Sequence, residues 1–324
     1  MPRLTLLEAV TLAHAWELQH DPSVVAFGED VGANGGVFRA TAGLQERFGA
    51  QRVFDAPLAE NMIGGLCVGM AAQGLKPVAE IQFMGFIYPA IDQIVNHMSR
   101  LRNRTRGRLT CPVVIRTPHG GGTRSPEHHS EAVESIFAHI PGLRVVCPSS
   151  PARAYGLLLA AIRDPDPVLF IEPTRIYRAF KQDVEDNGEA LPLDRCFVLR
   201  AGGDVTLVTW GAMTVETLRA ADELAQRNVH AEVIDLATIS PIDFDTILES
   251  VSKTGRLVSV HEAARNCGVG AEIAATVAEL AHYELEAPIK RVTGYDIVVP
   301  LARLEHDNIP SVARIVDAVR ETLA

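Results

Sequence analysis

Apolar, β-rich runs alternate with helix-forming stretches along almost the whole chain, and this alternation constrains the fold more than any other feature. The strand-like runs of the first half are "VVAFGED", "RVFDAPL", "KPVAEIQF", "CPVVIRTP", "LRVVCPSS" and "PVLFIEPT". Helical stretches such as "ENMIGGLCVGMAAQG", "YPAIDQIVNHMSRLRN" and "ARAYGLLLAAIRD" separate them. Near-continuous apolar strands separated by helices predict a parallel sheet that is covered on both faces.

The alternation is interrupted once, at 181–192. In this stretch, "KQDVEDNGEALP", hydrophobicity falls and acids accumulate, which is typical of a linker. Strand-like runs then resume as "DVTLVTWG", "HAEVIDLATIS", "RLVSVHEA" and "PIKRVTG", separated by helical stretches and followed by a last helix. A length of 324 residues also favours two domains. We therefore expect two α/β domains, at 1–185 and 186–324, each a mainly parallel sheet flanked by helices.

Composition excludes several classes of protein. Hydrophobic residues make up 47% and charged residues 22%, as in soluble globular proteins. A net charge of -10 repels nucleic acid and anionic membranes and favours a basic partner protein. The basic run "RLRNRTRGR" contains no aromatic residues, and we interpret it as the solvated end of a helix.

The N-terminus and the cysteines indicate a cytoplasmic protein. Residues 1–21 have helical apolar spacing and no basic region followed by a long apolar run, which predicts an amphipathic helix rather than a signal peptide. No apolar run approaches the roughly 20 residues of a membrane span. Five scattered cysteines without a CxxC pair argue against a zinc site or a disulfide framework.

Common catalytic and nucleotide-binding signatures are missing. The glycine-rich "GVGAEIAA" follows a predicted strand but lacks GxGxxG spacing, and we interpret its glycines as helix packing and capping. No P-loop, GxSxG, HExxH or kinase signature occurs.

Two segments that follow predicted strands carry candidate site residues. Glu60 lies where a strand passes into a helix, at the edge where parallel sheets bind ligands, although a carboxylate there also suits the first turn of a helix. Phe83, Phe86 and Tyr88 follow another strand. Aromatic residues so spaced are typical of a core, but the intervening glycine favours a loop where a ring could stack on a flat ligand.

The stretch "HGGGTRSPEHHS" places two histidines after a run of glycines. Histidine titrates near working pH, so a ring at the exit of a strand is a candidate for proton transfer, although most exposed histidines have no such role. We expect the adjacent side chains of His128 and His129 to point in different directions, with at most one facing a site.

Taken together and in order, several segments resemble a known family. These are "FGEDVGANGGVFRATAGLQERFG", "RVFDAPLAENMIGG", "PVAEIQFMGFIYPAIDQI", "PEHHS", "AAIRDPDPVLFIEP" and "SVHEAARNCGVGAEIAA". They closely resemble beta subunits of the thiamine-diphosphate-dependent decarboxylating component of 2-oxo acid dehydrogenase complexes. The likeness covers essentially the whole chain and is greatest to bacterial pyruvate dehydrogenase beta subunits.

The resemblance implies a thiamine pyrimidine-binding domain, a transketolase C-terminal-like domain and an α2β2 heterotetramer. The chain contains no GDG…N segment, by which such enzymes hold Mg²⁺ and the cofactor diphosphate, so the alpha subunit would hold both. Glu60 matches the glutamate that hydrogen-bonds a pyrimidine nitrogen, and Phe86 matches the aromatic residue near that ring. His129 matches the histidine that assists acylation of the lipoyl group.

The resemblance also implies a K⁺ site built largely from main-chain carbonyls. The positions that match it are Val113, Ala161, Ile162, Asp164 and Asp166. Asp166 replaces an asparagine of the family, and "RNR" replaces its "RYR". His128 replaces a residue that is commonly not histidine.

The expected function is oxidative decarboxylation of a 2-oxo acid, pyruvate in particular, with transfer of the acyl group to lipoyl groups on a dihydrolipoyl acyltransferase core. The C-terminal domain is expected to dock that core through Glu284, Glu286 and the carboxylate of Ala324. A branched-chain (2-oxoisovalerate) or acetoin dehydrogenase beta subunit is the alternative within the family. A non-catalytic assembly scaffold is the alternative outside it.

Overall fold

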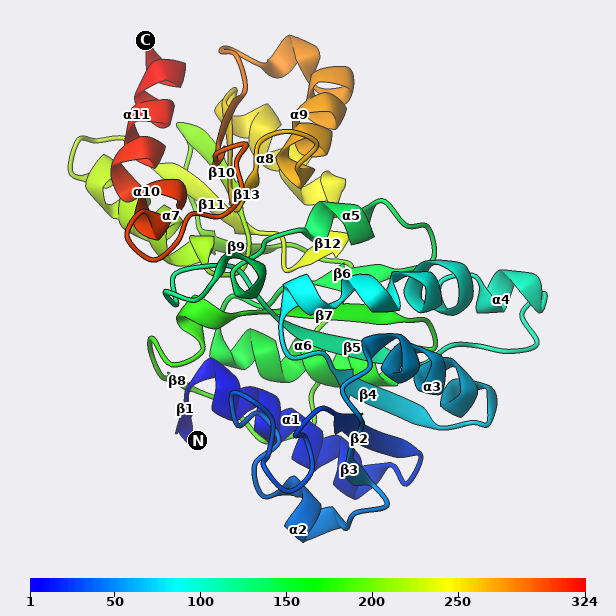
Figure 1. The fold of residues 1–324 in the computed structure, drawn as a ribbon. Helices are drawn as coiled ribbons and strands as arrows, with labels where there is room; N and C mark the ends of the chain where they lie inside the picture. Colours follow the sequence, from blue (N-terminus) through cyan, green and yellow to red (C-terminus); the bar gives the residue numbers. More distant parts are fainter.

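A seven-stranded sheet forms the centre of the N-terminal half. The computed structural model describes residues 1–324 and gives the strand order β12-β6-β7-β5-β4-β2-β3 (Figure 1). All neighbouring strands are parallel except β12, which is antiparallel to β6. The strands are β2 (Val24–Gly28), β3 (Val53–Asp55), β4 (Lys76–Glu80), β5 (Val114–His119), β6 (Arg144–Val146), β7 (Val168–Pro173) and β12 (Thr238–Ser240).

Helices cover both faces of this sheet, as the apolar strands predict. Helices α1 (Leu6–His20) and α6 (Pro151–Arg163) pack together with the residues of one face. The other face carries α3 (Glu60–Ala72), the π-helix η3 (Gln93–Met98) and α5 (Glu134–Ala138). Thr5 and Glu8 form a capping box at the start of α1, and the Ser150 side chain caps α6. Helix α1 confirms the helix expected at the N-terminus, but it is buried around most of its circumference rather than amphipathic, because it packs between the sheet and α6.

A five-stranded sheet of order β14-β13-β10-β11-β9 forms the C-terminal half. Its strands are parallel except for β9, which is antiparallel to β11. The strands are β9 (Phe197–Arg200), β10 (Val205–Thr209), β11 (Ala231–Asp235), β13 (Leu257–Ala264) and β14 (Lys290–Gly294). The helices are α7 (Met213–Ala225), α8 (Phe244–Thr254), α9 (Val269–Leu280), α10 (Glu305–Asn308) and α11 (Val312–Leu323). The expected fold class, two mainly parallel sheets flanked by helices, is confirmed.

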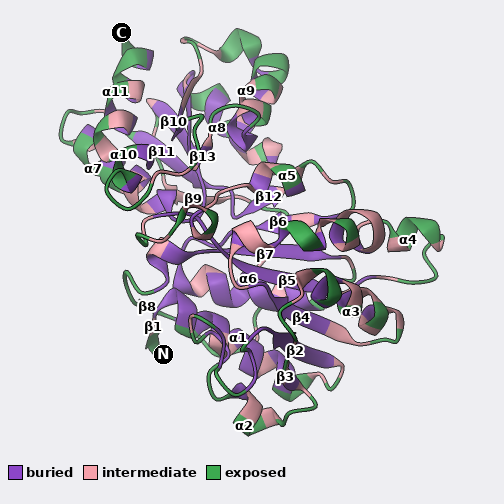
Figure 2. Cartoon of the chain, in the orientation of Figure 1, coloured by how far each residue is buried: buried purple, intermediate pink, exposed green.

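Smaller elements complete the chain. They are β1 (Arg3–Leu4) paired with β8 (Gln182–Asp183), α2 (Leu44–Phe48) and α4 (Leu101–Arg104). Helix α4 lies within the basic run and its arginines are exposed, as expected for a solvated helix end (Figure 2). None of the helices combines the length and apolar character needed to cross a bilayer.

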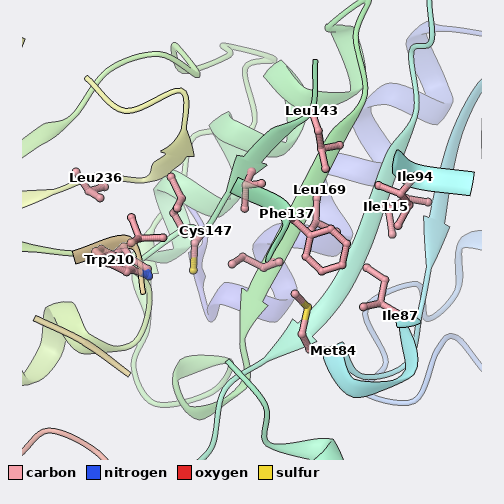
Figure 3. Packing of buried hydrophobic residues seen from close by; sticks show 14 of the residues in the cluster. Met84, Ile87, Ile94, Ile115, Phe137, Leu143, Cys147, Leu169, Trp210 and Leu236 are labelled. Atoms are coloured by element: carbon pink, nitrogen blue, oxygen red, sulfur yellow. The ribbon is translucent and has the colours of Figure 1, made fainter. Parts of the chain in front are cut away.

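One continuous apolar core connects the two halves. Its members include Met84 and Phe137 from the first half and Trp210 and Leu236 from the second (Figure 3). All four side chains are at most 3% exposed. Most strands of both sheets are buried, except the edge strands β9 and β3, while exposed residues lie mainly on the outer faces of the helices and in loops (Figure 2). Because packed interiors are dense and resist deformation, the two sheets form one framework.

The structure corrects two sequence-based expectations about elements. The single strand expected at 230–240 is two strands, because Ala237 has φ 51° and turns the chain between β11 and β12. The two strands therefore join different sheets. The helix expected at 88–103 is instead a 3₁₀ turn (Tyr88–Ala90), the π-helix η3 and α4. The π turn packs Gln93 against Gly64 of α3, where a Cβ would lie 2.8 Å from Gln93, so tertiary packing overrides the helical pattern.

Candidate active site

Four adjacent strands end at the same edge of the seven-stranded sheet and bring the candidate residues together. Strands β5, β4, β2 and β3 are neighbours and parallel, so their carboxyl ends lie on one side. Glu60 follows β3, Phe86 follows β4, and His129 follows β5. This edge is where open parallel sheets bind ligands. The topology thus gathers the three predicted residues from segments far apart in the sequence.

Glu60 is the first residue of α3, and its carboxylate does not cap the helix. The N-cap position is Ala59, and no side chain makes a capping hydrogen bond there. The Glu60 side chain is partly exposed and makes no hydrogen bond or ion pair within the chain. A carboxylate in the first turn is favoured by the helix dipole. The Glu60 carboxylate can therefore accept a hydrogen bond from a ligand at the carboxyl edge of the sheet.

Glu29 is a second carboxylate at this edge, and sequence reasoning did not single it out. It follows β2 directly and is 6% exposed, and its Oε1 has no hydrogen-bond partner. Burial, followed by the negative charges of Glu60 and Asp30, raises the pKa of Glu29. An acidic pair directly after a buried strand, "GED", was the available signal.

Aromatic rings pack against the histidines at this edge of the sheet. Phe86 ends the 3₁₀ turn η1 (Met84–Phe86), and His129 ends the turn η4 (Glu127–His129). The ring centroid of His129 lies 5.1 Å from that of Phe86 and 4.4 Å from that of Phe83, both edge to face. Phe83 and Phe86 are only partly buried. The expectation that these aromatic residues occupy loops rather than a strand is therefore confirmed.

His128 does not point away from His129, so that expectation was wrong. The two ring centroids are 4.2 Å apart, and the His128 ring also lies 5.5 Å from Phe86. Opposite orientation of adjacent side chains is a property of strands, whereas these residues lie in a 3₁₀ turn packed on Phe86. Burial and the neighbouring His128 lower the pKa of His129. His129 Nδ1 is buried without a hydrogen-bond partner.

Glycine 85 is required where the two turns meet. A Cβ at Gly85 would lie 2.1 Å from the carbonyl oxygen of His128. The backbones of η1 and η4 therefore touch, and only the absence of a side chain allows this approach. This contact sets the position of the His129 turn relative to Phe86.

Buried ion pairs fix the strands beneath the site. The Arg116 guanidinium of β5 donates to Glu172 at 2.7 Å and to Glu80 at 2.9 Å, and the Tyr177 hydroxyl donates to Glu172 at 2.6 Å. Arg116, Glu80 and Glu172 are at most 3% exposed. Buried charges are tolerated when they are paired and hydrogen-bonded, as they are here. Strands β4, β5 and β7 are therefore linked through side chains as well as through their backbones.

A second buried network connects the end of β5 to the C-terminal half. His119 Nε2 lies 2.9 Å from Glu134 Oε2, and the Trp210 indole N–H donates to Glu134 Oε1 at 3.2 Å. Burial opposes ionisation of Glu134, but the His119 hydrogen bond and charge outweigh it and lower the pKa of Glu134 to about 2. The same partnership raises the pKa of His119 against the opposing effect of its burial. This network anchors the first residue of the segment that leads to His129.

Four of the five residues expected to bind K⁺, Ala161, Ile162, Asp164 and Asp166, lie at or just after the C-terminal end of α6. Val113 lies directly before β5, and its carbonyl oxygen accepts a hydrogen bond from the Val168 N–H at 2.9 Å. No hydrogen bond reaches the carbonyl oxygens of Ala161 and Ile162: Pro165 has no N–H, and the Asp166 N–H donates to the Asp164 side chain at 2.8 Å. The Asp166 side chain accepts from Arg102 at 2.6 Å, and that of Asp164 pairs with Arg144 at 3.3 Å. Main-chain carbonyl oxygens that could act as ligands of a cation are thus present.

Each half of the chain matches the model of a known domain family. Residues 3–179 match the pyrimidine-binding domain of transketolase, and residues 194–315 match the transketolase C-terminal domain. A solved structure described as "Split gene transketolase, inactive beta4 tetramer" has a TM-score of 0.81 over 99% of both chains, at 24% sequence identity. That structure supports the fold. The chain thus has the two-domain architecture of transketolase-like, thiamine-dependent enzymes.

Curated relatives define the family within that class. The chain is 52% identical to the pyruvate dehydrogenase E1 component subunit beta of Acholeplasma laidlawii over 321 residues, covering 99% of this chain and 98% of the relative. It is 47% identical to the protein of the same name from Bacillus subtilis, covering 100% of this chain and 99% of the relative. The Staphylococcus aureus protein is 46% identical, with the same coverage. The chain belongs to the family of pyruvate dehydrogenase E1 component beta subunits.

Proposed function

We propose that this chain, paired with an alpha subunit in an α2β2 heterotetramer, decarboxylates pyruvate and transfers the acyl group to lipoyl groups of a dihydrolipoyl acyltransferase core. The observation that carries the proposal is the Glu60 carboxylate, which lies at the carboxyl edge of the sheet without a hydrogen-bond partner. The relatives of this chain carry the pyruvate dehydrogenase name. We place the boundary between the pyrimidine-binding and C-terminal domains at 185/186, between the two matched family segments.

The residues at this edge fit a thiamine pyrimidine ring. Glu60 would accept a hydrogen bond from a ring nitrogen, and its carboxylate would favour the tautomer that the reaction needs. The partly exposed ring of Phe86 would pack near the pyrimidine. Thiamine diphosphate, when bound, supplies the nucleophilic carbon and the electron sink for decarboxylation. The alpha subunit would hold Mg²⁺ and the diphosphate, because this chain has no GDG…N segment.

The buried carboxyl group of Glu29 interacts electrostatically with the Glu60 carboxylate. Its pKa is raised by burial and by the charge of Glu60, so Glu29 holds a proton more readily than an ordinary glutamate. Ionisation of Glu29 is therefore disfavoured beside the Glu60 carboxylate, which would meet the pyrimidine nitrogen. The fit to the cofactor thus rests on two carboxylates in unlike environments rather than on Glu60 alone.

His129 would serve the second half of the reaction. When a lipoyl disulfide opens, one sulfur takes the acyl group and the other takes a proton. With Nδ1 buried, Nε2 of His129 is the ring nitrogen that would meet the lipoyl sulfur. Burial and His128 lower the pKa of His129 and so favour the neutral ring, which can take up a proton released in the reaction and pass it to the departing thiolate.

The face of α3 next to Glu60 is the surface we assign to the alpha subunit. Met62 and Leu66 are each 38% exposed on this helix, and Leu58 before it is 81% exposed. Met62, Leu66 and neighbouring glycines line an apolar hollow of about 500 Å³. Exposed apolar surface of this kind, beside half of an active site, favours a permanent protein partner. The five free cysteines suit a cytoplasmic location.

The C-terminal domain would dock a basic segment of the acyltransferase core. Glu284 and Glu286 are exposed, but Arg256 already pairs with Glu286 at 2.7 Å. Glu284 and the terminal carboxylate at Ala324 are therefore the main contributors to attraction. We expect binding to weaken as ionic strength rises. Titration of the tetramer with the acyltransferase at low and high salt tests this, and equal affinity at both would contradict it.

The free carbonyls at the end of α6 support a K⁺ site. They would bind the cation together with the backbone of Val113, Asp164 and Asp166. We expect K⁺ to raise the melting temperature of the tetramer more than Na⁺ at equal ionic strength, because a cation bound only by the folded state stabilises it. Equal melting temperatures in the two salts would remove the site from the proposal.

Substitution of Glu60 tests the proposed function directly. Glu60→Gln should nearly abolish turnover of co-expressed tetramers at saturating thiamine diphosphate, while assembly remains intact, because an amide cannot favour the reactive tautomer as a carboxylate does. Glu46→Gln, in the first turn of α2, is the matched control and should keep full activity. Full activity of Glu60→Gln would refute the assignment. Assays with pyruvate, 2-oxoisovalerate and acetoin would identify the substrate, and a tetramer inactive with all three would instead favour a scaffold.

A further inference from the structure

The glycine run before His129 is held by carboxylates from the other domain. The Gly122 N–H donates to Glu305 Oε1 at 2.8 Å, and the Arg124 N–H donates to Glu305 Oε2 at 2.9 Å. The Gly121 N–H donates to the Glu262 carboxylate. Glu305 lies on α10 and Glu262 on β13, so both acceptors belong to the C-terminal half (Figure 1). Successive N–H groups in a turn form a concave anion site, which here is filled by side chains of the same chain.

The conformation of this loop depends on those contacts. Gly122 has φ 90°, and Arg124 has φ 59°, which is unfavourable for a residue with a side chain. Such a conformation persists only where its surroundings enforce it, and the Glu305 carboxylate is the acceptor for the Arg124 N–H. Glycine is also needed for space, since a Cβ at Gly122 would lie 2.3 Å from Arg175.

Glu305 also reaches the residue after His129. It is 1% exposed, and the Ser130 hydroxyl lies 3.5 Å from its Oε1. One buried carboxylate therefore touches both the start of the loop and the end of the η4 turn. Between the loop and the C-terminal half there remains a cavity of about 170 Å³, lined in part by Gly121, Ser130 and Glu305. The loop thus has space into which it could relax without Glu305.

We propose that Glu305 is a positioning residue that sets the place of His129 from the C-terminal domain. This inference rests on the proposed role of His129 in lipoyl acylation. Glu305 itself lies behind the loop and acts through the backbone N–H groups of Gly122 and Arg124 and through Ser130. The glycine run of the N-terminal domain is thus held in place by carboxylates of the C-terminal domain.

The test uses co-expressed α2β2 tetramers with Glu305→Ala and Glu305→Gln, the second of which keeps the side-chain volume. Asp307→Ala, an exposed acid on the same helix, is the matched control. We expect the Gly122 and Arg124 amides to exchange hydrogen faster in both Glu305 variants. We expect acylation of lipoyl groups to fall roughly 10²-fold in Glu305→Ala, the scale of a 1 Å misplacement, with a smaller loss in Glu305→Gln. Reduction of an artificial electron acceptor should change far less.

A double variant separates positioning from a general structural effect. Adding Glu305→Ala to His129→Ala should cause no further loss of acylation if Glu305 acts through His129, because residues acting as a unit are not additive. Additive losses would overturn the inference, and so would unchanged exchange of the two amides in the single variants. If exchange quickens while His129→Ala leaves acylation intact, the proposed role of His129 fails instead, and the Glu305 inference falls with it.

Discussion

Gly85→Ala is the substitution that the geometry of the site predicts most sharply. The added Cβ would lie 2.1 Å from the His128 carbonyl oxygen and 2.9 Å from its carbonyl carbon. Both are backbone atoms, so no change of rotamer relieves the clash. A carbon and a carbonyl oxygen ordinarily approach to about 3.3 Å, so one of the two turns must move by about 1.2 Å. Whichever turn moves, the position of His129 relative to Phe86 changes.

The displacement should reduce acyl transfer more than stability. Overpacking of this kind typically costs about 1–3 kcal/mol, which a folded tetramer should survive. A misplacement of about 1 Å at a reacting group can cost roughly 10²-fold in rate. We therefore expect Gly85→Ala to lower acetylation of lipoyl groups by about that factor while tetramers still assemble.

Two assays and one control make this prediction decisive. Lipoyl acetylation and reduction of an artificial acceptor would be measured on the same preparation, together with the melting temperature. Gly203→Ala is the control, because an added Cβ there meets nothing within 4 Å. If Gly85→Ala leaves acetylation and melting temperature at the level of Gly203→Ala, then the contact between the two turns does not position His129, and the reasoning is wrong.

His129→Ala should lower acetylation of lipoyl groups about 10²–10⁴-fold while an artificial acceptor is still reduced at an appreciable rate, since general acid-base help acts on the second step. His128→Ala should instead raise the pKa of His129 by removing a neighbouring charge, which moves the acidic limb of the acetylation profile to higher pH; identical behaviour of the two variants would contradict this assignment. Stability measured by urea unfolding should fall as pH drops from about 4.5 toward 2, because Glu134 is ionised in the folded state down to about pH 2, and Glu134→Gln should flatten that slope. His119 changes the free energy of unfolding in the opposite direction. Because its pKa is raised in the folded state, its stabilising contribution is present below pH 6.5 and is lost as the pH rises through the raised pKa. The isolated chain should bind thiamine diphosphate and Mg²⁺ poorly in calorimetry, because it has no GDG…N segment to hold the diphosphate; submicromolar binding would refute that.

The sequence predicts the sheets well because apolar runs report burial directly. Strand β5, for example, is buried at every position from Val114 to His119 and was expected as a continuous apolar strand. Position in a parallel sheet then identified Glu60 as a candidate, because a residue that follows a strand must lie at the carboxyl edge.

The remaining features depend on contacts between distant segments, which no local pattern encodes. Nothing around 230–240 indicates that β12 leaves its own sheet, since the turn depends on Ala237 adopting φ 51°. Nothing in the glycine run indicates its partners, whereas the structure shows a loop held by Glu262 and Glu305, residues far away in the sequence. The pKa of Glu29 is raised chiefly because packing around β2 buries its side chain. The position of Glu29 after a strand does not by itself indicate that burial.

Strand β12 has a consequence for how the chain folds. It pairs with β6 through Thr238 and Val146, and the Cys147 N–H donates to the Ala237 carbonyl at 2.7 Å. Until residues 238–240 have been synthesised, β6 is an open edge with unpaired backbone groups, of the kind that promotes association between chains. The N-terminal half therefore completes its sheet only after the first part of the C-terminal half has left the ribosome. A fragment ending at 185 would carry that edge permanently and should aggregate where the full chain does not.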